Sequence, residues 1–558
     1  MAKDILTPQE VWEDFPFDEI PQAELIDEKI IDGIVINRIR IDGKNTPSGR
    51  TGIFCLVARN QSLSVLPCIV AVSPLNKEPS ENFAVKLAQL GYMTAIVDVG
   101  GSFNENGYYT KYPEDISYAV FSGEENLVFS DNGNVKRTCF YEWSYSYFCA
   151  VKYFKSQSSV TAVCGLGYGE NATCIWHASS VQGFLDCAVA IENAGWRVYR
   201  SILKHSGELD PQFSDETLKF LAGIEPQSYA KSVSCPLLFL TATNDRRYDF
   251  DRAFDTVGRV GDSVYKAVYY SPNSSSVNDE RAYENTIKFF ETFLTGKNSL
   301  PKIPEVRAEA DNGEFRILGE VDKLGLKSVK LFVSEGVVDP ACRSYRGYDV
   351  SVKDGEFAFT YRLCAKSHIV CAFATAYYSN GFAISSNLTV KKVTEKTDKV
   401  LKVRNNVVFS GRDDGSETIF SGVMPDGSHE VFDTDGDCTV YKKSGPMDIC
   451  GVYSKYGLMA FKINAPCDKP DDDAILIFDA YSEENSEFTV TLTGEKGGQV
   501  KDFRARVSVV GGKVWHNVRL EMQRFKTDEG VSLKSFEKVK RITFTSKGKY
   551  LINNVLWV

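Results

Sequence analysis

Buried strands and helices alternate over the first half of the chain. Residues 66–74 form a continuous apolar run, residues 83–90 follow a helical period, and residues 91–98 form the next apolar run. Apolar runs of this length, bounded by turn residues, are typical of strands that are buried on both faces of a parallel sheet. The pattern predicts an α/β domain with a mostly parallel, doubly wound sheet.

The helical period stops at a polar, proline-bearing linker, residues 296–304. Beyond it, short alternating runs with turns about every ten residues predict a small immunoglobulin-like β-sandwich. A charged stretch then precedes a second all-β unit, which we interpret as a jelly roll. The predicted domains are residues 1–298, 305–395 and 402–558.

A glycine-rich turn stands inside the α/β pattern. The segment 165–169 reads Gly-Leu-Gly-Tyr-Gly, after a β-branched strand and before a run of small apolar residues typical of a helix. This is the frame of the nucleophile elbow G-x-S-x-G, in which a sharp strand-to-helix turn lifts one side chain and the next backbone N–H holds an oxyanion. Gly167 stands at the centre, where it keeps the turn and supplies no nucleophile. An ordinary glycine-rich turn is the alternative, while a phosphate loop fits worse because no Gly-Lys-Ser/Thr follows.

The order of these segments resembles the α/β-hydrolase superfamily, nearest its acetylxylan-esterase and dienelactone-hydrolase branch. An apolar strand, the turn, a strand of residues 235–245 that ends on aspartate, and a terminal helix of residues 283–294 follow one another as in that family. The resemblance implies that Asp245 occupies the position of the triad acid. It also places Ser73 near the second oxyanion donor, and Tyr168 where a backbone N–H or a phenol faces the pocket.

The family's histidine is absent from its expected loop. Residues 271–276 read Ser-Pro-Asn-Ser-Ser-Ser, so Ser275 marks a vestigial histidine position. The five histidines of the chain are at positions 177, 205, 368, 429 and 516. We expect His177 to be a packing residue, whereas His205 lies in the insertion that covers the pocket in this fold. Two of three triad members are therefore missing, and triad members act as a unit.

The C-terminal unit resembles the galactose-binding-like jelly rolls appended to carbohydrate-active enzymes. Trp515, Tyr453 and Tyr456 are candidates for stacking on a sugar ring, with core packing as the alternative.

Composition and charge limit the classes of partner and the cellular location that the sequence predicts. A net charge of −10 argues against nucleic acid, because no basic face is available to neutralise phosphates. The N-terminus lacks the apolar run of a signal peptide, and the 14 cysteines are dispersed, so we expect a cytoplasmic protein without a membrane segment. No metal or cofactor motif occurs, and the acidic segment 433–437 lacks the glycine and glutamate positions of an EF-hand.

Three functions remain open from the sequence. The first is a catalytically silenced hydrolase that binds a small-molecule or saccharide ligand. The second is an active esterase on an acylated carbohydrate or small ester, which draws its nucleophile and base from residues such as Ser102, Ser73 or His205. The third is a structural or assembly protein that uses the fold as a scaffold, and an oligomer is compatible with each of them.

Overall fold

The chain groups into two compact units. Unit 1 contains residues 1–241, 247–268 and 285–300, and unit 2 contains residues 242–246, 269–284 and 301–558. The computed structural model describes residues 5–75, 77–101, 107–123, 133–200, 202–209, 211–277, 279–297, 299–311, 314–363, 369–392, 406–412, 419–423, 439–496 and 499–558. Ser102, His368, His429 and the acidic segment 433–437 lie outside these residues.

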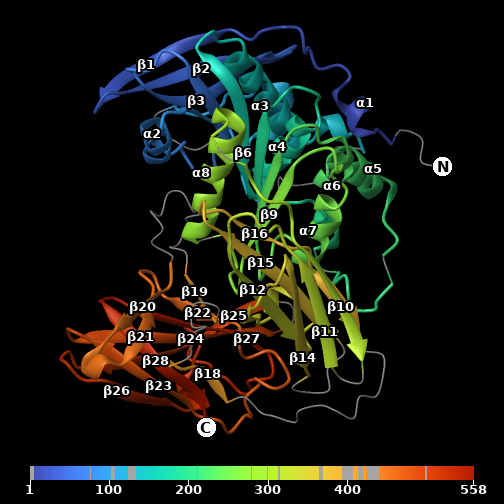
Figure 1. Cartoon of the computed structure of the whole chain (residues 1–558). Helices are drawn as coiled ribbons and strands as arrows, with labels where there is room; N and C mark the ends of the chain where they lie inside the picture. The colour runs from blue at the N-terminus through green and yellow to red at the C-terminus, as the bar shows by residue number, and fades with distance from the viewer. Residues whose placement is uncertain are drawn as a thin grey trace. The chain divides into compact units, whose positions relative to one another are not determined.

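A nine-stranded mixed sheet forms the α/β part, in the order β1-β2-β3-β5-β4-β6-β7-β8-β9. Its first strands, β1, β2 and β3, are drawn in blue in Figure 1. Strands β1, β2, β3 and β5 pair antiparallel, and β5, β4, β6, β7 and β8 pair parallel. The strands are β1 (Ala23–Ile31), β2 (Ile34–Thr46), β3 (Gly49–Asn60), β4 (Leu66–Val72), β5 (Met93–Val97), β6 (Val160–Tyr168), β7 (Cys187–Ile191), β8 (Leu237–Ala242) and β9 (Lys266–Ser271). This arrangement is an α/β-hydrolase sheet, so the predicted fold class is confirmed.

The central strands are apolar because helices cover them. Every residue of β5, β7 and β8 is buried, as expected for strands covered on both faces. Helix α2 packs on β3 and β5, α3 packs on β2, β4 and β6, and α4 packs on β6 and β7. The helices are α1 (Pro8–Trp12), α2 (Glu81–Gln89), α3 (Cys139–Lys155), α4 (Ala172–Ser179), α5 (Asp215–Gly223), α6 (Pro226–Tyr229), α7 (Phe250–Val257) and α8 (Glu280–Thr295).

Four antiparallel sheets make up most of unit 2. The first two have the orders β10-β11-β14 and β13-β12-β15-β16, with β17 paired to β15. Their strands are β10 (Glu305–Asp311), β11 (Glu314–Glu320), β12 (Leu326–Glu335), β13 (Arg346–Val350), β14 (Glu356–Arg362), β15 (Ile369–Tyr378), β16 (Ala383–Ser385) and β17 (Thr389–Lys392).

The other two sheets enclose one apolar core that includes Phe478, Phe488, Phe544 and Ile552. Their orders are β20-β21-β28-β23-β26, with β18 paired to β28, and β19-β22-β27-β24-β25. The strands are β18 (Val407–Phe409), β19 (Phe420–Gly422), β20 (Tyr441–Ser444), β21 (Cys450–Tyr453), β22 (Leu458–Ala460), β23 (Leu476–Ser482), β24 (Ser486–Lys496), β25 (Gln499–Val509), β26 (His516–Leu520), β27 (Val539–Ser546) and β28 (Tyr550–Trp557). Two sheets that share a core form a β-sandwich, as the alternation of short strands predicts.

The unit boundaries differ from the sequence-based division at residue 298. Residues 242–246 begin at the last residue of β8 and residues 269–284 include the end of β9, yet both stretches cluster with the β-rich part of the chain. The boundaries 1–298, 305–395 and 402–558 stay predictions. Two loops that the hydrolase resemblance assigns to catalysis therefore belong to the same compact unit as the β-sandwiches.

The described helices and cysteines were compared with the requirements of membrane spans and disulfides. Among the described helices, none has the length and apolar character needed to cross a membrane. Each cysteine in the described ranges is a free thiol, and all of them except Cys450 are buried.

Candidate functional site

The sharp turn after β6 is at Gly169. Gly169 has a φ of 50°, in the left-handed region, and stands between the end of β6 and the start of α4. Gly167 is still inside β6, and its φ lies outside the left-handed region. The left-handed residue of this turn is thus Gly169, two residues after Gly167, which the motif places at the centre of the elbow.

Space around the two glycines supports this placement. A Cβ on Gly167 would lie 2.7 Å from Cγ1 of Ile175 and 3.0 Å from the carbonyl oxygen of Asn171, closer than real side chains approach. A Cβ on Gly169 would instead lie 3.1 Å from the phenol oxygen of Tyr248. Gly167 is a packing glycine against α4, and a side chain on Gly169 would meet both the Tyr248 phenol and the strain of a left-handed φ.

The expected oxyanion donors are used in other ways. Tyr168 pairs with Ile191 in the ladder between β6 and β7, and it is buried. The backbone N–H of Ser73 donates to the carbonyl of Val97 at 2.9 Å, and the Ser73 carbonyl accepts from the Asn171 amide at 2.5 Å. The Ser73 backbone therefore joins the sheet to the helix that follows the turn.

An ion cluster lies directly after the turn. Oε1 of Glu170 is 2.6 Å from Nη1 of Arg197, and the Arg197 backbone N–H donates to both oxygens of Glu225 at 3.1 and 3.2 Å. Burial raises the pKa of Glu225 to about 7, against hydrogen bonds and the charge of Arg197, which lower it. Sequence reasoning missed this cluster, because its three residues are far apart along the chain.

The acid loop and the histidine loop meet inside unit 2. The Asn244 N–H donates to the carbonyl of Ser274 at 2.9 Å, and the Asn273 N–H donates to the hydroxyl of Thr243 at 2.8 Å. Asp245 follows Asn244 and is 6% exposed. Ser275 is half-buried, with its hydroxyl 3.8 Å from the sulfur of Met459. The structure thus brings the loops of Asp245 and Ser275 together, as the resemblance implies.

Both loops are fixed to the first β-sandwich by fully buried asparagines. The Asn244 amide donates to the carbonyl of Arg343 at 2.6 Å. The Asn273 amide donates to the carbonyl of Tyr345 at 2.9 Å and accepts from its N–H at 2.7 Å. Asn273 also has a left-handed φ of 53°, a conformation that asparagine adopts more readily than most residues. We call this set of contacts to residues 343–345 the asparagine clamp.

His177 is a packing residue. Its Nε2–H donates to the carbonyl of Ile224 at 2.7 Å, and its ring stacks on Tyr229 with 3.9 Å between centroids. Burial lowers its pKa to about 3, so the imidazole is neutral at physiological pH. This geometry agrees with the interpretation from the sequence.

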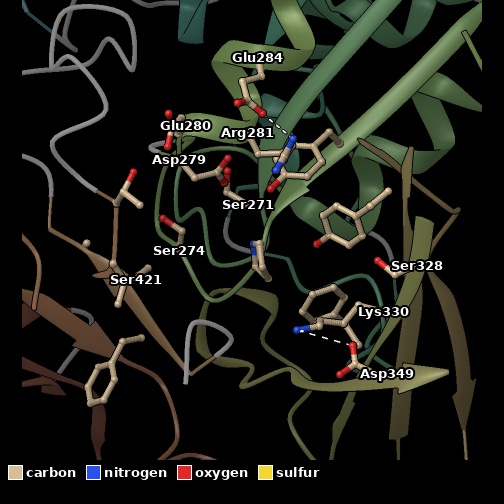
Figure 2. Close-up of a pocket in the computed structure, with 18 residues that line it drawn as sticks. Ser271, Ser274, Asp279, Glu280, Arg281, Glu284, Ser328, Lys330, Asp349 and Ser421 are labelled. Carbon is tan, nitrogen blue, oxygen red and sulfur yellow. Dashed lines mark hydrogen bonds and ion pairs between the residues drawn. The ribbon is translucent and has the colours of Figure 1, made fainter. Parts of the chain in front are cut away.

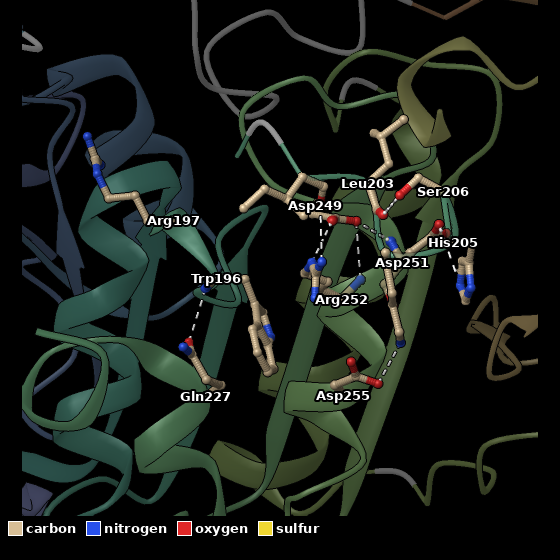
Figure 3. Close-up of polar contacts among 12 residues, drawn as sticks. Trp196, Arg197, Leu203, His205, Ser206, Gln227, Asp249, Asp251, Arg252 and Asp255 are labelled. Atoms are coloured by element: carbon tan, nitrogen blue, oxygen red, sulfur yellow. Dashed lines mark hydrogen bonds and ion pairs between the residues drawn. The ribbon is translucent and has the colours of Figure 1, made fainter. Parts of the chain in front are cut away.

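His205 pairs with a buried carboxylate (Figure 3). Its Nε2 is 3.8 Å from Oδ2 of Asp251, near the start of α7. The same segment is anchored to α7 by Lys204, whose ammonium is 2.8 Å from Asp255, and by Arg252, which donates to the carbonyl of Ile202 at 3.2 Å. Burial, with the neighbouring charge of Asp251, raises the pKa of Asp249 to about 6.

A cavity of about 470 Å³ lies in unit 2 beside the histidine loop (Figure 2). Ser271 and Ser274 line it, together with four acidic residues and two basic ones. Arg281 is 2.5 Å from Glu284, and Lys330 is 3.9 Å from Asp349. Each basic side chain thus has an acidic neighbour, and hydroxyl groups dominate the remaining polar wall.

The three aromatic candidates of the C-terminal sandwich differ in position. Tyr453 lines a separate pocket of that sandwich. The Trp515 indole N–H donates to the carbonyl of Pro446 at 3.2 Å, behind the wall of the same pocket. Tyr456 lies under the ammonium of Lys455, at 5.2 Å, and is not among the residues that line this pocket. Within the described ranges, no group of His, Cys, Asp and Glu side chains is placed to hold a metal ion.

Comparisons with known proteins find structural likeness only. No protein-family model matches the chain, and no curated protein matches it. Among solved structures, it is similar to an acetyl xylan esterase from Paenibacillus sp. R4, at 15% identity and a TM-score of 0.42 over 51% of this chain and 92% of that one. Acetyl xylan esterase 1 from Thermoanaerobacterium sp. JW/SL YS485 matches at 12% identity and a TM-score of 0.41, over 50% and 92% of the two chains. A putative dienelactone hydrolase from Klebsiella pneumoniae subsp. pneumoniae MGH 78578 matches at 12% identity and a TM-score of 0.33, over 47% and 99%.

The two glycines of the turn should respond differently to serine. Gly167→Ser forces a Cβ into Ile175 and the α4 backbone, so we expect a loss of about 3 kcal/mol in the free energy of unfolding. Gly169→Ser places an L-residue at a left-handed φ and should cost about 1 kcal/mol. Urea denaturation of both variants measures the difference, and equal stabilities would contradict the displaced turn.

His177 should make the protein sensitive to acid. Its pKa is lower in the folded chain than the ordinary value of about 6.5, so below pH 6.5 the unfolded chain binds a proton that the folded chain excludes. We expect this residue to remove about 1.4 kcal/mol of stability per pH unit between pH 6 and 4. Denaturation of wild type and His177→Gln at both pH values measures it. An identical loss of stability in the variant would show that His177 does not carry the effect.

Proposed function

We propose that this chain is a catalytically silenced α/β-hydrolase-fold protein that binds a ligand of the saccharide class. The observation that carries the proposal is the glycine at the left-handed turn between β6 and α4. Gly169 has no side-chain atom that could attack an acyl carbon, and Gly167 has no room for one. A serine hydrolase requires a nucleophile at this turn.

The asparagine clamp supports the same proposal. In a working triad, the acid orients a histidine that can reach the nucleophile. Here the loop after β9 contains no histidine, and Asn273 in that loop is fully buried against Tyr345. The loop that would present the base is used instead to hold a β-sandwich.

Ligand binding would use the β-rich unit. Its cavity beside the histidine loop is lined by hydroxyl groups, four acidic residues and two basic ones, and such hydrogen-bonding groups suit a polyhydroxylated ligand. Its C-terminal sandwich has a second pocket with tyrosine walls. Hydroxyl-rich walls and aromatic faces are the groups with which proteins hold sugars through hydrogen bonds and stacking.

A second candidate is an active esterase that uses an unrecognised nucleophile. The His205–Asp251 pair favours it, because a carboxylate beside an imidazole is the arrangement of a general base and its orienting acid. Ser73 is a poor nucleophile for this mechanism, since it is 1% exposed.

A third candidate is an assembly protein. Strand β1 stands at the end of the sheet order and exposes Leu25, Ile30 and Ile31 to 55%, 58% and 41%. An exposed apolar edge strand is a template for pairing with another chain.

Ester hydrolysis separates the active-esterase candidate from the other two. We expect the purified chain to hydrolyse p-nitrophenyl acetate at the buffer rate, on the order of a million-fold below a working triad, because nucleophile and base are both missing. Asp245→Ala and His205→Ala should leave that rate unchanged.

Turnover that disappears in Asp245→Ala would reveal a functional triad and contradict the proposal. Turnover that disappears only in His205→Ala would instead assign the activity to the His205–Asp251 pair. A matched control is His516→Ala, which alters a histidine of the C-terminal sandwich.

A further inference from the structure

A basic pocket lies at one end of the C-terminal sandwich. Its volume is about 530 Å³. It is formed by the end of β20, the turn from β20 to β21, the ends of β21 and β23, the loop before β26 and the start of β28. The side chains that matter below are Lys443, Tyr453, Tyr481, Lys513 and Lys549.

The charge of this pocket opposes that of the chain. Three lysines and one acidic residue, Glu483, line it, which gives +3 − 1 = +2, whereas the whole chain carries −10. The lysines come from three separate parts of the sequence, so they converge by folding. Among the described residues, no carboxylate lies within ion-pair distance of Lys513 or Lys549. Two of the three ammonium groups are therefore available to an anionic group of a ligand.

Aromatic rings stand beside these charges. The ring of Tyr453 stacks on Tyr441 with 5.4 Å between centroids, and the Lys443 ammonium lies 4.7 Å from the Tyr453 ring centre. Tyr481 packs on Trp515 at 5.7 Å. Tyr453 and Tyr481 are both half-buried, so each ring is supported from behind and still reaches the pocket. Supported rings of this kind bind the apolar face of a pyranose with little loss of side-chain entropy.

A strained turn shapes one wall. Met447 and Asp448 have φ values of 58° and 56°, consecutive left-handed residues without glycine, and Met447 is 78% exposed. The turn is closed by the Gly445 N–H, which donates to the carbonyl of Ile449 at 2.9 Å. Such conformations persist only where the surroundings impose them, and they are concentrated at binding sites.

Trp515 packs against the residues on either side of this turn. Its ring fills the space beside Gly445 and Gly451, where a Cβ would come within 2.7 and 2.8 Å of the indole. Its N–H also donates to the Pro446 carbonyl. Trp515 is thus a positioning residue behind the wall rather than a stacking surface for the ligand.

We propose that this pocket binds an acidic saccharide, a chain of pyranose rings that carries carboxylate or sulfate groups. The tyrosine faces hold the rings, and Lys513 and Lys549 pair with the anionic groups. This inference rests on the proposed function and narrows its ligand from saccharides in general to anionic ones.

The experiment is isothermal titration calorimetry of the full chain with three tetrasaccharides. Tetragalacturonate carries carboxylates, a chondroitin sulfate tetrasaccharide carries carboxylates and sulfates, and xylotetraose is neutral. We expect binding of at least one acidic tetrasaccharide and affinity at least about tenfold weaker for the neutral one, a difference that corresponds to the loss of a few charged contacts. The acidic ligand that binds more tightly identifies the anionic group.

Charge reversal with neighbouring lysines as controls tests the pocket itself. Lys513→Glu and Lys549→Glu should each weaken acidic-saccharide binding about tenfold, because each replaces an ammonium group that pairs with the ligand. Lys442→Glu and Lys547→Glu alter exposed lysines close by that do not line the pocket, and they should bind like wild type. Far-ultraviolet circular dichroism checks that each variant is folded.

The outcomes distinguish this inference from the proposed function. Equal binding of xylotetraose, with no effect of the lysine variants, would overturn the acidic-ligand inference and leave saccharide binding intact. Equal weakening by control and pocket variants would show a diffuse charge effect and would also overturn it. No binding of any tetrasaccharide would contradict both the pocket's assignment and the saccharide class, while ester hydrolysis separately decides whether the hydrolase site is silent.

Discussion

Two buried asparagines determine how unit 2 is held together. Asn244 follows β8 and Asn273 follows β9, and their side-chain amides bind the backbone of residues 343–345. Both are fully buried, so their polar atoms must be satisfied within the protein. A buried amide left without partners costs about 1–3 kcal/mol, which makes these loops parts of the core rather than free surface loops.

Under the proposal of a silenced hydrolase, the same contacts account for a hydrolase fold that keeps its shape without its chemistry. Catalysis requires that an acid, a base and a nucleophile be positioned together, whereas stability requires that polar loops be satisfied. In this chain, the loops that hold the acid and the base in a working triad satisfy polar groups of the core instead. Gly169 keeps the turn after β6 and Asp245 remains after β8, but the loop after β9 holds asparagine and serine. Fold and function are separable in this way because function depends on a few side chains grafted onto the sheet.

The sequence predicted the fold better than the site. Runs of apolar and β-branched residues identified β4, β5, β6 and β8, because strands buried on both faces carry no charged residues here. The turn was misplaced by two residues, since the run Gly-Leu-Gly-Tyr-Gly offers more than one glycine as its centre. Only the packing of Ile175 against Gly167 decides between them, and that contact is tertiary. The asparagine clamp joins residues about a hundred positions apart, and local pattern has no signal for it. The role of Trp515 could not be predicted for the same reason. The sequence around a tryptophan near glycines is the same whether its ring supports a pocket wall or lines the pocket.

The central claim is that no serine of this chain acts as a nucleophile. Incubation of the native protein with a fluorophosphonate, followed by intact-mass measurement, tests it most directly, because this reagent forms a stable adduct with an activated serine. The account predicts no mass increase on the native chain. Stoichiometric addition at a single serine, abolished when the protein is denatured beforehand, would contradict it.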